Sequence, residues 1–131
     1  VRRGDYVTSA ATERKRVTSE AYFRDGISKV SGAKTSAPVG FFSDDQDWCK
    51  ETFGDIKSAH FVEPNCSDPD AHHLFTMSKA TNFVISNSSF SWWAAYLSSS
   101  PQKRVVTPKN WMLDGSYPMS DIVLPDWETL G

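Results

Sequence analysis

The feature that most constrains the fold is a change of hydrophobic period within residues 83–97. Residues 83–85, Phe-Val-Ile, are the aromatic and β-branched run typical of a buried strand. Apolar side chains then recur at i, i+3, i+4 and i+7, as in an amphipathic helix, at Phe90, Trp93, Ala94 and Leu97. The segment predicts a strand that turns directly into a helix, with this stripe and Trp92 buried in the core.

The polar turn between that strand and helix consists of Asn87, Ser88 and Ser89. These residue types are common helix N-caps, so capping alone explains them. The alternative is an anion site, because the first turn of a helix has N–H groups without intrahelical partners and carries a partial positive charge. In an open α/β sheet the turn lies at the carboxyl end of a strand, where nucleotide phosphates commonly bind. The turn by itself leaves both roles open.

Strand and helix patterns alternate along the rest of the chain. Strands are predicted near residues 38–42, 59–63 and 104–108, and helices near residues 18–31, 45–53 and 71–77. This order favours a parallel sheet with helices on both faces. Val1 and Arg2 resemble the end of a first strand, so we expect an uncovered sheet edge and association of two copies. The irregular C-terminal segment is expected to fold back over the sheet.

Composition limits the class of protein. A chain of 131 residues with 39% hydrophobic residues predicts one soluble globular domain. Its net charge of −2 gives no general attraction to nucleic acid or anionic membranes, so local groups must hold any anion. The sequence has no apolar run of about 20 residues and no signal peptide. Cys49 and Cys66 match neither a zinc pattern nor a disulfide framework, and are expected to be free thiols.

Two adjacent arginines, Arg2 and Arg3, precede Gly4 at an expected turn from strand to loop. Two guanidinium groups suit a diphosphate, because each planar fork gives paired, charge-assisted hydrogen bonds to phosphate oxygens. The alternative is a solvated pair that forms a salt bridge with Asp5, since exposure is the usual state of arginine. The dipeptide alone does not decide between them.

Acidic and histidine residues give little indication of a metal site. Residues 45–47, Asp-Gln-Asp, and residues 68–70, Asp-Pro-Asp, match the DxD pattern of some metal-dependent glycosyltransferases. Helix capping and turn preferences explain both. His72 and His73 are adjacent on a predicted helix and point about 100° apart, unlike an i, i+4 metal-binding pair. The sequence predicts no metal and no cofactor.

Four segments in order resemble the bacterial α-1,2-fucosyltransferase family. They are residues 2–6, Arg-Arg-Gly-Asp-Tyr; residues 42–49, which begin Phe-Ser-Asp-Asp and end Trp-Cys; residues 87–97, which begin Asn-Ser-Ser-Phe-Ser-Trp-Trp; and residues 108–111, Pro-Lys-Asn-Trp. The resemblance implies the C-terminal, Rossmann-like half of a GT-B-like enzyme, with residues 1–131 as a donor-binding domain truncated at its N-terminus. The implied reaction is metal-independent, inverting transfer of fucose from GDP-fucose to the 2-hydroxyl of a galactoside.

The resemblance also implies roles for individual residues. Arg2 would hold the β-phosphate with Arg3 beside it, and Asp5 would be a candidate base or would orient the arginines. The remaining donor-site residues implied by the family are Ser43, Asp44, Asp45, His73, Asn87, Ser88, Ser89 and Phe90. Asp44 and Asp45 would contact ribose or guanine, or act as structural caps.

Two departures from the family pattern concern the site. The histidine that precedes the arginine pair in the family is not in this sequence, and His73 stands where family members usually have an aspartate associated with the base. A neutral imidazole cannot reproduce a carboxylate that accepts two hydrogen bonds from guanine. The acceptor half of such enzymes is also missing, so we expect the chain alone to be inactive. The implied location is the bacterial cytoplasm, with peripheral association to the inner membrane.

Two other classes of protein compete with this interpretation. A receiver-like binding module would use Asp44 and Asp45 to hold Mg²⁺, but it needs another aspartate at the end of a central strand. Residues 86 and 87 at one such end are Ser-Asn. A serine hydrolase would use Ser88 or Ser89, but no Gly-x-Ser-x-Gly elbow surrounds them.

Overall fold

The computed structural model describes residues 1–4, 7, 18–32, 36–63, 65–112, 115 and 118–131. In chain order the elements are α2 (Glu20–Ser31), β1 (Val39–Phe41), α3 (Gln46–Phe53), β2 (Ala59–Phe61), α4 (Pro69–Ser78), β3 (Asn82–Val84), α5 (Ser89–Leu97), β4 (Arg104–Pro108), η2 (Met119–Asp121) and β5 (Glu128–Leu130). The predicted α/β class and the alternation of strands and helices are confirmed. Within the described residues, no helix is long and apolar enough to cross a membrane.

The strands pair in parallel but form two sheets instead of the single expected sheet. β1 pairs with β2 through Val39 opposite Ala59. The second sheet has the order β3-β4-β5, with Phe83 opposite Val105. The C-terminal segment thus adds β5 to a sheet edge, which the sequence did not predict. Its three residues, Glu-Thr-Leu, are too short to show a reliable period.

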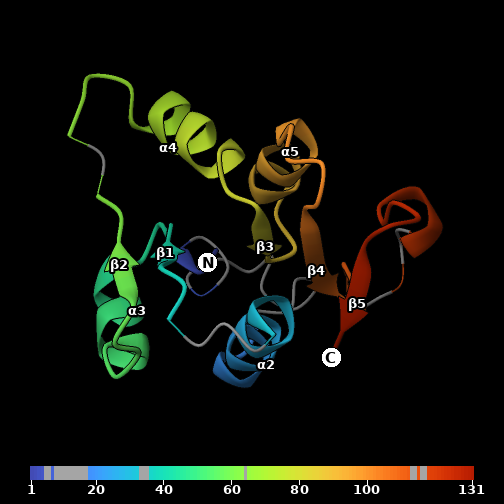
Figure 1. Cartoon of the computed structure of the whole chain (residues 1–131), viewed down its shortest axis with the longest axis horizontal. Helices are drawn as coiled ribbons and strands as arrows, with labels where there is room; N and C mark the ends of the chain where they lie inside the picture. The colour runs from blue at the N-terminus through green and yellow to red at the C-terminus, as the bar shows by residue number, and fades with distance from the viewer. Residues whose placement is uncertain (5–6, 8–17, 33–35, 64, 113–114, 116–117) are drawn as a thin grey trace.

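Helices lie on both sides of the strands, with α2 on one side and α4 and α5 on the other (Figure 1). Two clusters of buried side chains follow from this layering. The first lies under α2 and α3 and consists of Tyr22, Phe23, Phe41, Cys49, Phe53 and Val106. The second lies under α5 and consists of Phe83, Ile85, Ala95, Val105 and Trp127. Adjacent residues of β4 belong to different clusters because strand side chains alternate between faces.

Helix α2 holds the first cluster against β3. It begins at Ser19, whose side chain accepts the N–H of Tyr22, and ends at Gly32 with φ of 54°. Gly26 faces β3 so closely that a Cβ there would lie 2.5 Å from Val84 Cγ1. The hydroxyl of Tyr22 donates to the carbonyl of Ile85 at 2.7 Å. These contacts fix Ile85, two residues before the polar turn.

The predicted burial of the α5 stripe is confirmed for Ala94 and wrong for Trp93 and Leu97. The buried residues of α5 are Ser91, Ala94 and Ala95, whereas Trp93 is 50% exposed and Leu97 is 54% exposed. Helix α5 is apolar over most of its circumference, so the spacing of its apolar residues did not identify one face. Small side chains occupy the buried side, where α5 packs against α4 and the second cluster. Trp92 is half-buried and donates its indole N–H to the carbonyl of Ile122 at 2.8 Å.

Candidate functional site

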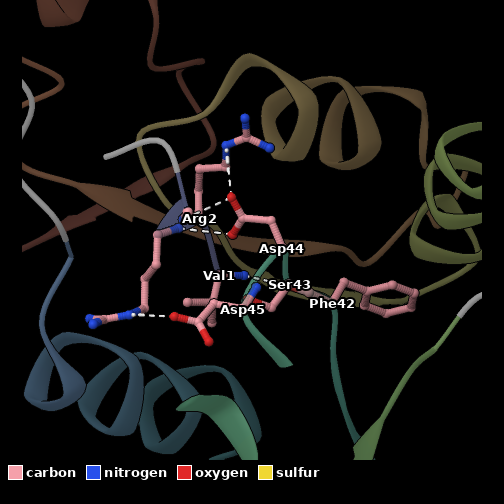
Figure 2. A network of polar contacts seen from close by, with 8 residues as sticks. Val1, Arg2, Phe42, Ser43, Asp44 and Asp45 are labelled. Atoms are coloured by element: carbon pink, nitrogen blue, oxygen red, sulfur yellow. Dashed lines mark hydrogen bonds and ion pairs between the residues drawn. The ribbon is translucent and has the colours of Figure 1, made fainter. Parts of the chain in front are cut away.

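The arginine pair forms ion pairs with the two acids that follow β1. Arg2 Nε lies 3.3 Å from Asp44 Oδ2, and Figure 2 shows these side chains facing each other. Arg3 Nε lies 3.4 Å from Asp45 Oδ2. The guanidinium of Arg3 also stacks on Trp48, 4.0 Å from the ring centroid. The Arg2 side chain is 42% exposed, so this guanidinium remains accessible to a ligand.

Asp44 also fixes the backbone that carries the arginines. Its carboxylate accepts the N–H of Arg3 at 2.9 Å and the N–H of Gly4 at 3.0 Å. A Cβ at Gly4 would lie 2.9 Å from Asp44 Oδ2, so only glycine allows this approach without a shift. The two candidate pieces, at residues 2–4 and 43–45, therefore form one structural unit. Asp5 and Tyr6, which the sequence analysis included in this motif, lie outside the described residues.

Asp45 and Ser43 have structural roles in the same turn. Asp45 is the N-cap of α3 and accepts the N–H of Trp48 at 3.1 Å, which confirms the capping alternative. The hydroxyl of Ser43 accepts the N–H of Asp45 at 2.9 Å. Trp48 lies three residues after the N-cap, and this position brings its ring under Arg3. The turn is thus held by side chains that also surround the arginines.

The start of α5 differs from the other helix starts in the described residues. Ser19, Asp45 and Asp68 each accept a backbone N–H at the starts of α2, α3 and α4. Ser88 is the N-cap of α5, but its side chain forms no capping hydrogen bond within the part of the chain that is described. The simple capping explanation for Ser88 is therefore not supported by the geometry.

Other hydrogen bonds hold the polar turn without using the donors of the first helical turn. Ser88 N–H donates to the carbonyl of Ser86 at 2.8 Å, and the buried Ser91 hydroxyl donates to the carbonyl of Ser88 at 3.0 Å. Asn87 Nδ2 donates to the carbonyl of Trp111 at 3.1 Å, which ties the turn to the C-terminal segment. Among the described residues, the N–H groups of Ser89 and Phe90 have no acceptor. A rigid turn therefore presents open donors at the positive end of a helix.

One cavity lies between the strand ends that precede the two regions. It has a volume of about 420 Å³, and its lining includes Val1, Phe42, Ser86 and Ser91. Val1 and Phe42 adjoin the arginine unit, whereas Ser86 and Ser91 flank the polar turn. The carboxyl ends of β1 and β3 thus border the same space. Ser86 and Ser91 were not among the predicted site residues, because serine near a helix start is so common that it gives no distinct signal.

His73 lies next to the same strand end. Its ring packs edge-on against Phe42, with ring centroids 5.4 Å apart. Burial lowers the pKa of His73 below its usual value, which favours the neutral imidazole. Nε2 of His73 is buried and has no hydrogen-bond partner in the described structure. Phe90, in the first turn of α5, is half-buried.

Metal-ligating side chains do not gather at this site. Among the residues that the structure describes, no group of three or more histidine, cysteine, aspartate or glutamate side chains could hold a metal ion. Cys49 is buried and Cys66 is exposed, and both are free thiols, as expected. Burial raises the pKa of the Cys49 thiol.

Comparison with known proteins identifies glycosyltransferases as similar to this chain. The family described as Glycosyl transferase family 11 matches residues 1–130. A similar protein is the Escherichia coli O-antigen biosynthesis glycosyltransferase WbnK, 30% identical over 99% of this chain and 43% of the relative. An α-1,2-colitosyltransferase of Escherichia coli is 34% identical over 85% of this chain and 39% of that relative. The chain therefore spans about two fifths of the length of these relatives. No solved structure matches.

Proposed function

Because the chain belongs to glycosyl transferase family 11, we propose that it forms the part of a glycosyltransferase that binds the nucleotide-sugar donor. The donor that we infer is GDP-fucose, and the reaction is transfer to the 2-hydroxyl of a galactoside. The observation that carries the proposal is that two arginines and an uncapped helix start follow the carboxyl ends of β1 and β3, which border one cavity. In this proposal residues 1–131 are the Rossmann-like half of a GT-B-like enzyme.

The arginines and the helix start together suit a diphosphate. Arg2, which is accessible, exchanges its ion pair with Asp44 for a bidentate contact to phosphate, while Asp44 keeps the backbone hydrogen bonds. The N–H groups of Ser89 and Phe90 and the Ser88 hydroxyl accommodate the other phosphate oxygens. As the bond between sugar and phosphate breaks, negative charge grows on the GDP leaving group, and these preorganised donors stabilise it. This provides the neutralisation for inverting transfer without a metal.

The residues beside the cavity suggest how the nucleoside is held. Asp44 and Asp45 follow β1, at the strand end where an α/β sheet contacts a ribose. His73 lies beside Phe42, and one of its ring nitrogens hydrogen-bonds to the Val62 backbone, so as a neutral imidazole it would offer Nε2 as one acceptor to a base. Asn87 keeps the turn in place through Trp111. The single acceptor of His73 predicts weaker selectivity for guanine than a carboxylate would give.

Acceptor binding belongs to a larger protein in this proposal. Proximity and orientation of two reactants can supply about 7–11 kcal/mol of a reaction barrier, and this requires groups on the acceptor side. The relatives are more than twice as long as this chain, and those groups would lie in the additional length. We therefore expect the 131-residue chain alone to bind GDP but not to transfer fucose. The proposed setting is the bacterial cytoplasm, at the inner membrane surface.

The identity of the donor sugar has a specific alternative. The colitosyltransferase that matches this chain transfers colitose by its name, so the colitosyl donor is the second candidate. The proposed site contacts the diphosphate and the base of the donor. Both sugar donors would share these groups if they carry the same nucleotide. Competition between the two sugar donors for the same GDP site distinguishes them.

Calorimetric titration of the chain with GDP, ADP and Mg²⁺ tests the proposal. We expect GDP to bind without metal and ADP to bind more weakly, because phosphate contacts are shared and base contacts are not. Binding of Mg²⁺ alone, without GDP binding, would instead support the receiver-like module. No binding of either nucleotide by folded protein would contradict the donor-binding role.

A further inference from the structure

Exposed aromatic and aliphatic side chains gather on two neighbouring helices. Among the described residues, the exposed large apolar side chains are Val7, Phe75, Trp93, Tyr96 and Leu97, and all except Val7 belong to α4 and α5. These helices pack together on the side of the strands opposite α2 (Figure 1). We call Phe75, Trp93, Tyr96 and Leu97 the α4–α5 patch. Exposed apolar side chains that gather in this way mark an interaction surface, whereas scattered ones do not.

Three members of the patch lie on one face of α5. Trp93, Tyr96 and Leu97 occupy positions i, i+3 and i+4, which are neighbours on a helix surface. The rings of Trp93 and Tyr96 meet edge to face, with centroids 5.5 Å apart. Tyr96 also stacks on Trp92, whose indole N–H is bonded to the carbonyl of Ile122. The rings are therefore already ordered, so contact with another surface costs little side-chain entropy.

Two lysines lie where α4 and α5 end. The hydroxyl of Ser98, the C-cap of α5, donates to the carbonyl of Ala80 at 3.0 Å, so the two helices end side by side. Lys79, the C-cap of α4, holds its ammonium 4.5 Å from the ring centroid of Phe75. The ammonium of Lys103 donates to three carbonyls at the end of α5, at 3.0–3.2 Å. Within the part of the chain that is described, neither lysine forms an ion pair with a carboxylate.

The charges along this part of the sequence indicate the kind of partner. Residues 71–113 contain four cationic residues, Lys79, Lys103, Arg104 and Lys109, but no aspartate or glutamate. The whole chain has a net charge of −2, so all of its acids lie outside this segment. Asp70 is in the first turn of α4, and Asp121 is in η2, next to the Ile122 that binds Trp92. The acid-free segment thus complements an anionic surface, which attracts nearby lysines.

We propose that the α4–α5 patch docks on the surface of an anionic lipid bilayer. Tryptophan and tyrosine favour the headgroup region, because each ring is apolar and has one polar edge. Phe75 and Leu97 would reach the boundary of the acyl chains, while Lys79 keeps its charge among the lipid phosphates. Interfacial binding increases with buried apolar area and with attraction to anionic lipids, and the patch combines both.

Docking through this patch leaves the proposed donor site open to water. The polar turn lies at the N-terminal end of α5, whereas Leu97 is the last residue of that helix. The nine residues of α5 separate these ends by about 12 Å. The inference rests on the proposed function only for its membrane setting, because no residue of the patch belongs to the arginine unit or the polar turn.

Flotation of the chain with lipid vesicles tests the proposal. Vesicles of equal parts phosphatidylglycerol and phosphatidylcholine are the anionic probe, and vesicles of phosphatidylcholine alone are the neutral one. We expect binding to the anionic vesicles to be about 10-fold tighter, and added salt to weaken it because salt screens the charges. No binding of the folded chain to anionic vesicles, or equal binding to both kinds, would overturn the proposal.

Two variants locate the surface on the chain. Trp93→Ser combined with Leu97→Ser should weaken binding to anionic vesicles about 10-fold, whereas Val7→Ser, which changes an exposed apolar residue outside the patch, should not. Lys79→Glu should also weaken binding, and Lys57→Glu is its control because Lys57 is exposed between α3 and β2. The lysine variants decide the result if the double variant does not fold. Undiminished binding by either patch variant, as folded protein, would overturn the proposal.

Two further measurements separate this proposal from its alternatives. Calorimetry with GDP should give the same affinity for the double variant and the unmodified chain. Vesicle binding by an unmodified chain that does not bind GDP would contradict the donor-binding role alone and support the patch. Light scattering without lipid detects self-association. A dimer that the double variant cannot form, with no binding to vesicles, would assign the patch to a second copy of the chain and overturn the lipid partner.

Discussion

Asp44 Oδ2 lies 3.3 Å from Nε of Arg2, and the same carboxylate accepts the N–H groups of the next two residues, Arg3 and Gly4. One side chain thus positions both the backbone and the charge of the arginine motif. An ion pair with a partly exposed arginine is weak, because solvent screens it. In the proposed donor complex, phosphate would replace Asp44 as the partner of Arg2, while the backbone hydrogen bonds of Asp44 keep the loop in place. The ligand-free chain already holds the Arg2 guanidinium close to the position that the proposed phosphate contact requires.

Replacement of Arg2 by lysine should weaken GDP binding by about 1–3 kcal/mol, roughly 5- to 150-fold in Kd. Arg2→Lys keeps the positive charge but removes the planar fork that contacts two phosphate oxygens. Calorimetry with GDP measures the change, and Arg104→Lys is the matched control because Arg104 pairs with Glu128 far from the arginine motif. Equal GDP affinity of Arg2→Lys and the unmodified chain would place Arg2 outside the phosphate site.

The alternation of elements was predictable because each strand and helix has a local signal. Helix α2 begins at a serine cap and ends at a glycine with positive φ, and α3 begins at an aspartate cap. Such signals depend on residues near in sequence, and the predicted positions were confirmed within a few residues. The packing of α5 was not predictable, because apolar residues occur on most of its circumference and its contacts with α4 and the second cluster determine the buried face.

The partners within the site also required the structure. In the sequence Asp5 is the nearest acid to the arginines, and it lies outside the described residues. The structure adds Asp44 and Asp45, which pair with Arg2 and Arg3 from another part of the chain. Long-range pairing depends on which strand ends are neighbours, and sequence periodicity does not report this. The sequence predicts the serines at α5 as a candidate site, but the open donors beside them became visible only from the hydrogen bonds.

Replacement of Trp93 by alanine should cost only about 1 kcal/mol of unfolding free energy, in the range of an exposed aromatic pair. Trp93 is 50% exposed and contacts Trp92 and Tyr96 edge-on. Trp127→Ala is the matched comparison, because Trp127 is 6% exposed and belongs to the second cluster. That change should cost about 3–5 kcal/mol. Denaturant unfolding of both variants checks the order, and similar losses would show that Trp93 is covered in solution.

Replacement of Tyr22 by phenylalanine should destabilise the fold by about 1–2 kcal/mol, because it removes a buried hydrogen-bond donor. The Tyr22 hydroxyl donates to the carbonyls of Ile85 and Val106, at 2.7 and 3.2 Å, and so connects α2 to both β3 and β4. Tyr96→Phe is the control, since Tyr96 is 47% exposed, and should change stability by less than about 0.5 kcal/mol. Chemical denaturation measures both. A Tyr22→Phe variant as stable as the Tyr96→Phe variant would contradict the structural role of this hydroxyl.

The stability of the chain should decrease as pH falls below about 6.5, in part because of His73. Burial lowers the pKa of His73 in the folded state, whereas in the unfolded state the pKa is near 6.5. Between those two values the unfolded chain binds a proton that the folded chain does not, so acid favours unfolding. The stabilisation is complete above pH 6.5 and is lost toward the lower folded-state pKa.

His73→Phe should remove this contribution while preserving the edge-on contact with Phe42. Unfolding free energies at pH 7.5, 6.5 and 5.5 measure the slope, and the variant should lose less stability over this range than the unmodified chain. The difference cannot exceed about 1.4 kcal/mol per pH unit for one proton. Direct titration of the His73 ring by NMR provides an independent check of the cause. A His73 pKa at or above 6.5 in the folded chain would show that the ring is not desolvated, and the neutral imidazole proposed beside the nucleotide base would lose its support.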